Sequence, residues 1–348
     1  MNVERNKKSN IKNPLTGKGK ITYIISSIFL LFLIILSLPI ILRFIIGQNI
    51  TSSVNTFHEF PVTVNPQNKT IIEDEKVNAF LANKHSLLGA TALESRFSFW
   101  NIFENIALII ADNSWYENTA SFGNRFVTIR PGMRKEQVAI AFGDVLNWNN
   151  KQEKEFITRA GTSTLPLVEG SFTPGIYSVE LSMTPSEVQS IINERFSDEI
   201  LSHYGTSTQK IVPIKDALII ASLIQRETVS TDGMRLLSGI MWNRLFLGMN
   251  LQIDSTLQYA KANKSTEMSW WPKVVPNDKY ISSPFNTYKY NGLPPSPIAN
   301  PSVEAILAAL NPVKTSCLFY FNDKNGDFHC SDNYEDHVSQ IKKYYSIL

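Results

Sequence analysis

The sequence predicts an α+β protein in which a single N-terminal transmembrane helix is followed by a small βαα subdomain and a mixed α/β domain. Three observations support this prediction. They are a long apolar run near the N-terminus, strand-like segments next to Pro-Gly and Asn-Gly turns, and apolar residues at helical spacing in the second half. The chain has 348 residues, 43% of them hydrophobic and 18% charged, which is enough for one sizeable core or two modest ones.

The transmembrane helix is predicted at residues 21–46. This run is apolar and carries no charge except Arg43, and about 20 apolar residues span a bilayer as a helix. The alternative, a cleaved signal peptide, has an apolar region of about 7–15 residues followed by a small-residue cleavage site. This run is longer and is not followed by such a site. Basic residues concentrate before the run, so residues 1–20 are predicted to be a cytoplasmic tail. We expect a single-pass protein of the cell (inner or cytoplasmic) membrane, with the remainder on its outer side.

The charge distribution argues against nucleic acid as a partner. The formal net charge is +2, but seven of the 33 basic and one of the 31 acidic residues lie in residues 1–43, which leaves about −4 for the rest. Nucleic-acid binding needs a clustered basic face that neutralises phosphates. The histidines show no ligand spacing with the two cysteines, so no metal and no cofactor are expected.

Cys317 and Cys330 flank a predicted β-hairpin. Residues 318–321 and 327–329 have strand-like composition, and the Asn-Gly pair at 325–326 is typical of a hairpin turn. The two cysteines are then cross-strand or diagonal neighbours, and an oxidising compartment would permit a disulfide between them. Whether the bond forms depends on geometry that the sequence leaves open.

Residues 47–124, which follow the membrane helix, carry mixed signals and no assignable chemistry. The small subdomain is predicted at residues 125–165. It comprises a strand at 126–129, a Pro-Gly turn, a helix through residues 138–142 and a second helix at about 150–159. Such a βαα unit resembles LysM carbohydrate-binding modules. It is therefore expected to be either a glycan-contacting surface or a packing scaffold.

Residues 166–348 form the predicted mixed α/β domain, and its key segment is a helix at residues 216–227, which contains no Gly or Pro. Glu227 lies three residues after Ile224 and seven after Ile220, so it shares their apolar face. Partial burial there favours the neutral carboxyl and raises its pKa, as a general acid near neutral pH requires. The alternative is a structural carboxylate that reaches solvent or pairs with a nearby arginine.

Loops dense in Asn, Gln, Thr and Pro follow this helix, and they offer the neutral hydrogen-bonding groups expected for sugar hydroxyls and N-acetyl groups. The chain resembles the endolytic murein transglycosylase family (MltG, YceG-like), and the resemblance covers about residues 125–348. The motifs that carry the resemblance are Glu227-Thr228, Asn243-Arg244-Leu245, Gly248-Met249, Leu251-Gln252, Asp254, Thr256, Ser283-Pro284, Asn286-Thr287-Tyr288, Gly292-Leu293-Pro294-Pro295, Asn300-Pro301, Asn311-Pro312, Lys314-Thr315, residues 319–331 and Tyr334-Glu335-Asp336-His337.

The resemblance implies an enzyme that cleaves the MurNAc-β-1,4-GlcNAc bond of peptidoglycan and leaves a 1,6-anhydroMurNAc end, terminating or trimming nascent strands. Glu227 would be its catalytic acid and base. Asp254 is interpreted as a positioning group; as a nucleophile it would instead make the enzyme a lysozyme-like hydrolase. The candidate substrate-binding residues, for whose amides loop capping is an equal alternative, are Gln252, Asp254, Asn243, Asn286 and Tyr288. Aromatic candidates for sugar stacking, for which packing is the default, are Tyr259, Trp270, Trp271 and Tyr288.

The chain departs from the family pattern at three positions. Gln225 stands where the family usually has an acidic residue, Ser255 replaces the usual Pro, and Ser296 replaces a Gly. Gln225 in particular suggests the alternative function, a catalytically inactive, membrane-anchored glycan-binding scaffold of the cell-wall synthesis machinery. The expected partners are peptidoglycan glycan strands and the membrane, with cell-wall synthases as further candidates.

Overall fold

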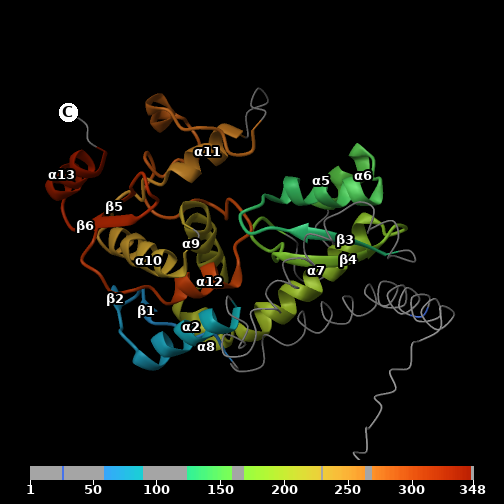
Figure 1. Ribbon diagram of the computed structural model, residues 1–348, viewed down its shortest axis with the longest axis horizontal. Coiled ribbons are helices and arrows are strands. Elements are labelled where there is room, and N and C mark those ends of the chain that lie inside the picture. Colours follow the sequence, from blue (N-terminus) through green and yellow to red (C-terminus); the bar gives the residue numbers. More distant parts are fainter. Residues whose placement is uncertain are drawn as a thin grey trace, which may run out of the picture.

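The computed structural model describes residues 59–88, 124–158, 168–228, 230–262 and 269–345, together with Ser26. Over these ranges the chain is a mixed α/β protein in which helices dominate and strands form two-stranded antiparallel sheets (Figure 1). The predicted cytoplasmic tail and, apart from Ser26, the predicted transmembrane helix lie outside the described residues. Among the helices that are described, none combines the length and apolarity needed to cross a membrane.

The strands pair as β1–β2, β3–β4 and β5–β6. In chain order the elements are β1 (Val64–Asn65), β2 (Thr70–Ile71), α2 (Glu75–Leu88), β3 (Asn124–Ile129), α5 (Lys135–Leu146), α6 (Asn150–Thr158), β4 (Gly175–Glu180), α7 (Pro185–Glu199), η1 (Leu201–His203), α8 (Thr206–Ile211), α9 (Ile214–Glu227), α10 (Thr231–Phe246), α11 (Asp254–Ala262), η2 (Pro276–Tyr280), α12 (Val303–Leu310), β5 (Phe319–Asn322), β6 (Phe328–Ser331) and α13 (Tyr334–Tyr345).

The smaller unit of the fold consists of β3, β4 and the helices α5, α6 and α7 (Figure 1). The strand, turn and helix pair expected after residue 125 are present, and β3 pairs along its six residues with β4. Phe142 of α5 and Phe156 of α6 share one apolar core with Tyr177 of β4 and Ile192 of α7. The core of this unit therefore continues well beyond residue 165.

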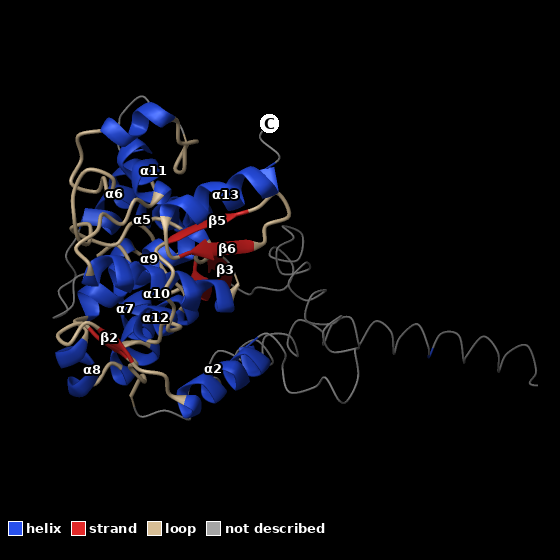
Figure 2. Cartoon of the chain, turned by 90° about the vertical axis from the view of Figure 1, so that its left-hand side faces the viewer, coloured by secondary structure: helices blue, strands red, loops and turns tan. Residues whose placement is uncertain are grey.

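The larger unit is organised around α9, which packs against α10, α11 and α12 (Figure 1). Residues 217–224 of α9 are all buried, as expected for a helix surrounded by apolar partners. α10 ends where Gly248 adopts a left-handed φ of 68°, as is typical of a glycine just after a helix. α13 lies beside the β5–β6 hairpin (Figure 2).

Part of residues 47–124, to which the sequence assigns no chemistry, belongs to the core of the larger unit. Phe60 and Val64 are buried in the same apolar cluster as α9 and α12. The backbone N–H of Thr63 donates a hydrogen bond to the carbonyl of Leu310 at the end of α12 (3.0 Å). The other end of this region, residues 89–123, lies outside the described residues.

A fully buried asparagine, Asn300, joins the two units. Its backbone carbonyl accepts a hydrogen bond from the N–H of Gly132 (2.8 Å), and its Nδ2 donates to the carbonyl of Met133 (2.9 Å). Its Oδ1 accepts from the N–H groups of Gly170 (2.9 Å) and Phe172 (3.1 Å). Gly132 and Gly170 have positive φ angles of 82° and 96°, a conformation that is strained for residues with a side chain. One residue thus holds the turn after β3 and the loop before β4 against the larger unit.

Candidate active site

Glu227 is the last residue of α9 and lies where that helix leaves the core. The helix is buried through residue 224, whereas residues 225–228 are partly exposed. Thr228 ends the helix in an extended conformation, with φ −150° and ψ 152°. The carboxylate therefore lies at the boundary between the apolar core and the surface.

Two other segments of the chain bring polar groups to this carboxylate. Ser255, at the start of α11, donates to Oε1 of Glu227 from both its Oγ (2.8 Å) and its backbone N–H (3.3 Å). The hydroxyl of Tyr320 on β5 donates to Oε2 over a longer distance of 3.4 Å. The two carboxylate oxygens thus have different surroundings.

Burial and hydrogen bonding act on Glu227 in opposite directions. Burial is the largest influence and raises the pKa of Glu227 above its ordinary value of 4.5, and the charge of Asp254 also raises it. The hydrogen bonds from Ser255 and Tyr320 lower it, and the N-terminus of α11 favours negative charge in the same way. The net pKa is raised, which confirms the expectation from helix periodicity.

Asp254 lies beside this carboxyl but is engaged by a different partner. The hydroxyl of Tyr288 donates to its Oδ1 at 2.5 Å. Burial first, and Asp254 second, raise the pKa of Tyr288, so the phenol keeps its proton and acts as a donor. Both residues were predicted for the site, and the structure places them together. In the part of the chain that is described, no group of three or more His, Cys, Asp or Glu side chains could hold a metal ion.

Gln252 lies in a strained turn just before α11. Its φ is 51°, in the left-handed region that residues other than glycine adopt at a cost. The turn is fixed because the N–H of Gln252 donates to the carbonyl of Thr287 and the N–H of Ile253 donates to Thr287 Oγ1, both at 3.0 Å. The side chain of Gln252 is exposed while its neighbours Leu251 and Ile253 are buried. This candidate ligand is therefore presented at the surface by a rigid backbone.

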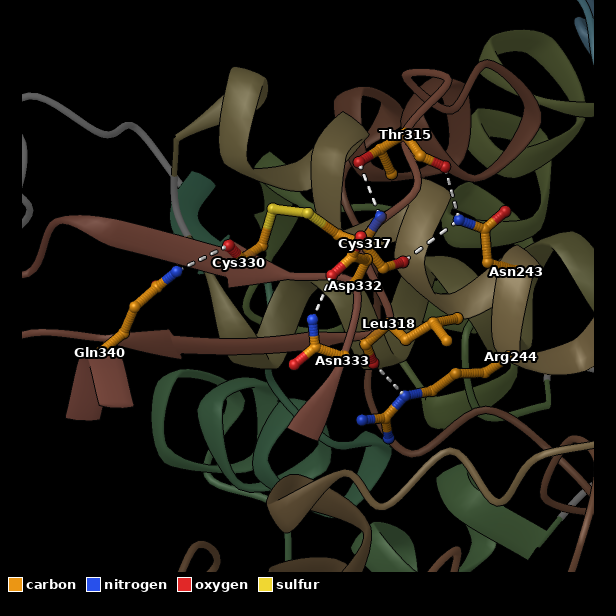
Figure 3. Close-up of a disulfide and its surroundings, with 9 residues drawn as sticks. All are labelled: Asn243, Arg244, Thr315, Cys317, Leu318, Cys330, Asp332, Asn333 and Gln340. Carbon is orange, nitrogen blue, oxygen red and sulfur yellow. Dashed lines mark hydrogen bonds between the residues drawn. A yellow bond between two sulfur atoms is a disulfide. The ribbon is translucent and has the colours of Figure 1, made fainter. Parts of the chain in front are cut away.

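The amides of Asn243 and Asn286 bond to the protein's own backbone. Nδ2 of Asn243 donates to the carbonyls of Thr315 (2.7 Å) and Cys317 (3.2 Å), as Figure 3 shows. Asn286 is fully buried, and its Nδ2 donates to two loop carbonyls at 2.9 and 2.8 Å. Of the two alternatives for these residues, the observed contacts are those of loop capping.

Two residues that the sequence analysis did not single out, Tyr320 and Arg244, also lie at this site. Arg244 is 5% exposed, and its guanidinium donates to the carbonyls of Leu318 and Leu251, both at 2.6 Å. It thereby ties the strand that carries Tyr320 to the loop that precedes α11. Figure 3 shows the link from Arg244 to Leu318. Both residues lie within the quoted motifs, which was the only signal that could have indicated them.

A disulfide between Cys317 and Cys330 closes the β5–β6 hairpin (Figure 3). The Cα atoms of the two cysteines lie 5.8 Å apart, and Cys330 is the cross-strand partner of Tyr320. The hairpin prediction is confirmed, and the disulfide that the sequence left open is present. The bond therefore braces the strand that brings Tyr320 to Glu227.

Comparison with known proteins gives a consistent family assignment. The model of the YceG-like family matches residues 67–343. The chain belongs to the YceG-like family. The resemblance stated from the motifs is confirmed, and the match begins earlier than expected, at residue 67 instead of 125, in agreement with the packing of the N-terminal segment on the core.

Curated relatives share part of their length with this YceG-like chain. A protein of Streptococcus pneumoniae serotype 2 (strain D39) named endolytic murein transglycosylase is 33% identical over 181 residues, which are 51% of this chain and 32% of the relative. A Bacillus subtilis (strain 168) protein of the same name is 29% identical over 243 residues, 63% of this chain and 65% of the relative. The chain thus spans about a third and about two thirds of these relatives.

A crystal structure of a yceG-like protein from Listeria monocytogenes has the same fold. It superposes with a TM-score of 0.51 at 22% identity and covers 81% of this chain and 97% of the other. At that level of identity the likeness concerns the mixed α/β fold alone.

The departure from the family pattern at Gln225 does not affect the carboxylate of Glu227 directly. Oε1 of Gln225 accepts a hydrogen bond from the N–H of Ser302 (3.0 Å), just before α12. An acidic residue here could accept the same bond, so the amide keeps this contact without the charge. Ser296, the replacement in the proline loop, donates to the carbonyl of Pro297 (3.3 Å).

Three of the four aromatic candidates for sugar stacking, Tyr259, Trp270 and Trp271, already contact arginines. The guanidinium of Arg226 lies 3.8 Å from the ring centroid of Trp271. That of Arg134 lies 4.2 Å from Tyr259 and 5.4 Å from Trp270. Cation–π contacts of this kind stabilise packing. Arg226 is thereby directed to Trp271 and forms no ion pair with Glu227 within the described residues.

Proposed function

We propose that this chain is a membrane-anchored endolytic lytic transglycosylase. It would cleave the MurNAc-β-1,4-GlcNAc bond of peptidoglycan and leave a 1,6-anhydroMurNAc end. The observation that carries the proposal is the carboxyl of Glu227, which has a raised pKa at the rim of the core and whose Oε2 accepts, among the described residues, one long hydrogen bond. The names of the curated relatives, endolytic murein transglycosylase, support the same reaction.

In the proposed reaction Glu227 acts first as an acid and then as a base. The protonated carboxyl gives its proton to the bridging oxygen, and the bond between that oxygen and C1 of the muramyl sugar breaks with its electron pair going to the oxygen. The carboxylate of Glu227 then takes the proton of the muramyl 6-hydroxyl as that oxygen bonds to C1. The proton returns to Glu227, and no water is consumed.

The surroundings of Asp254 favour this reaction over hydrolysis. Glycosidases that use water usually need a second carboxylate as nucleophile or base. Asp254 is the nearest such group, and its Oδ1 accepts the 2.5 Å hydrogen bond from Tyr288. We therefore assign Asp254 to positioning, with the exposed Gln252 as a candidate sugar ligand.

The proposed location follows from the sequence. The apolar run at residues 21–46 would anchor the chain in the cell membrane, with residues 1–20 in the cytoplasm and the rest on the outer side, where peptidoglycan is found. Trimming or terminating nascent strands would bring the chain close to cell-wall synthases. The LysM-like unit around β3, α5 and α6 would contact glycan.

The inactive scaffold has lost its main support. It was suggested by Gln225, but the amide of Gln225 contacts Ser302 and not Glu227. Ser255 and Tyr320 surround Glu227 with donors, an arrangement that a binding scaffold does not need. We therefore retain the enzyme as the proposed function.

The products released from purified peptidoglycan strands test the proposal. Mass spectrometry should find anhydro ends with the wild-type chain and none with Glu227→Gln, while Glu180→Gln, at an exposed carboxyl at the end of β4, should behave like wild type. Reducing ends would identify a hydrolase instead. Strand binding without products, equal in all three proteins, would identify a scaffold.

A further inference from the structure

Ser255 makes an unusual double contact with the proposed acid. Its Oγ and its backbone N–H both donate to the same oxygen, Oε1 of Glu227, at 2.8 and 3.3 Å. Ser255 is 2% exposed, so water does not compete for these donors. The contact spans 28 positions in the sequence and therefore depends on the packing of α11 against α9.

The start of α11 explains why both donors are free for this role. α11 begins at Asp254, so the N–H of Ser255 lies in the first turn and has no acceptor within the helix. The residue type then adds the hydroxyl. A proline, which the family usually carries here, would have neither an N–H nor an O–H to donate. The double contact is thus a property of this chain's own sequence.

The second oxygen of Glu227 is held much less firmly. Its donor, the hydroxyl of Tyr320, lies 3.4 Å away, whereas hydroxyl hydrogen bonds are usually about 2.7–2.8 Å long. A carboxylic acid places its proton on the oxygen that accepts the fewer and weaker hydrogen bonds. The asymmetry between Oε1 and Oε2 therefore determines which oxygen carries the proton.

We propose that Ser255 is a positioning residue that holds Oε1 of Glu227 as a permanent acceptor and so makes Oε2 the oxygen that carries and transfers the proton. The inference rests on the proposed function, because it assigns one oxygen to the acid step. Without Ser255 the carboxyl would be free to exchange the roles of its two oxygens. Fewer molecules would then present the proton to the bridging oxygen.

Removing these donors has a defined effect on the titration of Glu227. Hydrogen bonds to a carboxylate stabilise its charged form and lower its pKa, and Ser255 acts on Glu227 in this direction. Ser255→Ala should therefore raise the pKa of Glu227, by about one pH unit for the loss of one such bond. Ser255→Thr keeps both donors and should restore the wild-type value.

Infrared titration of the full-length chain tests the inference without requiring activity. The band of the protonated Glu227 is assigned by its loss in Glu227→Gln. In Ser255→Ala it should persist to higher pH and move to higher frequency, because the C=O at Oε1 has lost a donor. Ser255→Pro should show both changes at least as strongly. The band of Glu169, whose pKa is raised to about 8, should not move and serves as an internal reference.

Ser302→Ala is the matched control. Ser302 caps α12 by accepting a hydrogen bond from the N–H of Ala305 (3.3 Å), so its loss weakens a helix start without touching Glu227. If Ser255→Ala leaves the Glu227 band where it is in wild type, or if Ser302→Ala moves it equally, the positioning role is wrong. A chain that never cleaves strands but shows the expected band shifts would refute the proposed function and leave the role of Ser255 in place.

Strand cleavage provides the second measurement. In Ser255→Ala the alkaline limb of the pH profile of cleavage should shift to higher pH by the same amount as the midpoint of the infrared titration. The value of kcat should fall about tenfold while KM stays unchanged. A fall confined to KM would place Ser255 in substrate binding and overturn the inference.

Discussion

The carboxyl groups of Glu169 and Glu227 each lie against the first turn of another helix, α5 for Glu169 and α11 for Glu227, and burial raises the pKa of both. Oε1 of Glu169 accepts a hydrogen bond from the N–H of Lys135 at the start of α5 (2.9 Å), just as Oε1 of Glu227 accepts one from Ser255 at the start of α11 (3.3 Å). The pKa of Glu169 rises to about 8. A raised pKa thus reports burial at either place and does not by itself identify an acid catalyst.

Access and neighbours separate the two carboxyls. Glu169 is 6% exposed and bonds to Nδ2 of Asn300 (3.2 Å), so it belongs to the joint between the two units. Glu227 is partly exposed and lies beside the Asp254–Tyr288 pair. The first carboxyl is therefore part of the joint, whereas the second lies where a molecule from outside can reach it.

The largest expected effect comes from removing each acid in turn. Glu227→Gln should lower the rate of strand cleavage by at least about 100-fold, the usual contribution of a general acid. Glu169→Gln, which keeps the shape and one acceptor, should lower it by less than about tenfold. Initial rates of release of anhydro-ended fragments provide the measurement. Equal losses in the two variants would contradict the distinction between them.

The joint itself should be costly to break. Asn300→Ala leaves the buried N–H groups of Gly170 and Phe172 without their acceptor, which we expect to cost about 3 kcal/mol in the free energy of unfolding. Asn243→Ala removes an amide that is only partly buried and should cost about 1 kcal/mol. Urea denaturation of both variants measures the difference. A cost for Asn300→Ala no greater than for Asn243→Ala would show that the joint contributes little.

The joint should also make stability depend on pH. The pKa of Glu169 is about 8 in the folded chain against an ordinary value of 4.5. Between these two pH values the folded chain keeps a proton that the unfolded chain has lost. Stability should therefore fall as pH rises through this window. Glu169→Gln should flatten that part of the curve and exceed wild type above it by about 1 kcal/mol or more. The free energy of unfolding between about pH 5 and pH 9 is the test, and a wild-type curve that rises with pH would refute it.

The smallest expected effect concerns the second oxygen of Glu227. Tyr320→Phe removes a hydrogen bond of 3.4 Å that lowers the pKa of Glu227. Its loss should raise that pKa by less than about half a pH unit, since long hydrogen bonds are weak. The alkaline limb of the cleavage profile reports the change. A shift larger than that of Ser255→Ala would assign the main control of Glu227 to Tyr320.

Features with local causes were predictable from the sequence. α7 begins after Thr184, whose side chain accepts a hydrogen bond from the N–H of Glu187 while Glu187 bonds back to the N–H of Thr184. This capping box is visible in the sequence because its partners are three residues apart. The stop of α10 at Gly248 and the hairpin turn at residues 325–326 are local in the same way.

The contacts that build the site and the joint between the units are not local and were not predicted. In the site, Tyr320 contacts Glu227 across 93 positions of the sequence, and in the joint, Gly170 contacts Asn300 across 130. A single sequence holds no pairing signal over such separations. Asn243 and Asn286 show a second limit. An amide that suits a sugar hydroxyl suits a backbone carbonyl equally well, so only packing could decide between them.

The joint at Asn300 determines which residues a fragment of the smaller unit must contain. A fragment that ends at residue 165 would lack β4 and α7, which complete the core of the smaller unit, and the asparagine that fastens its two loops. A transplant of this unit into another protein would need residues 124–199, together with an acceptor face that offers an amide where Asn300 lies. The smallest part of this unit that could be moved as a whole is therefore larger than the strand and helix pair that the sequence predicts.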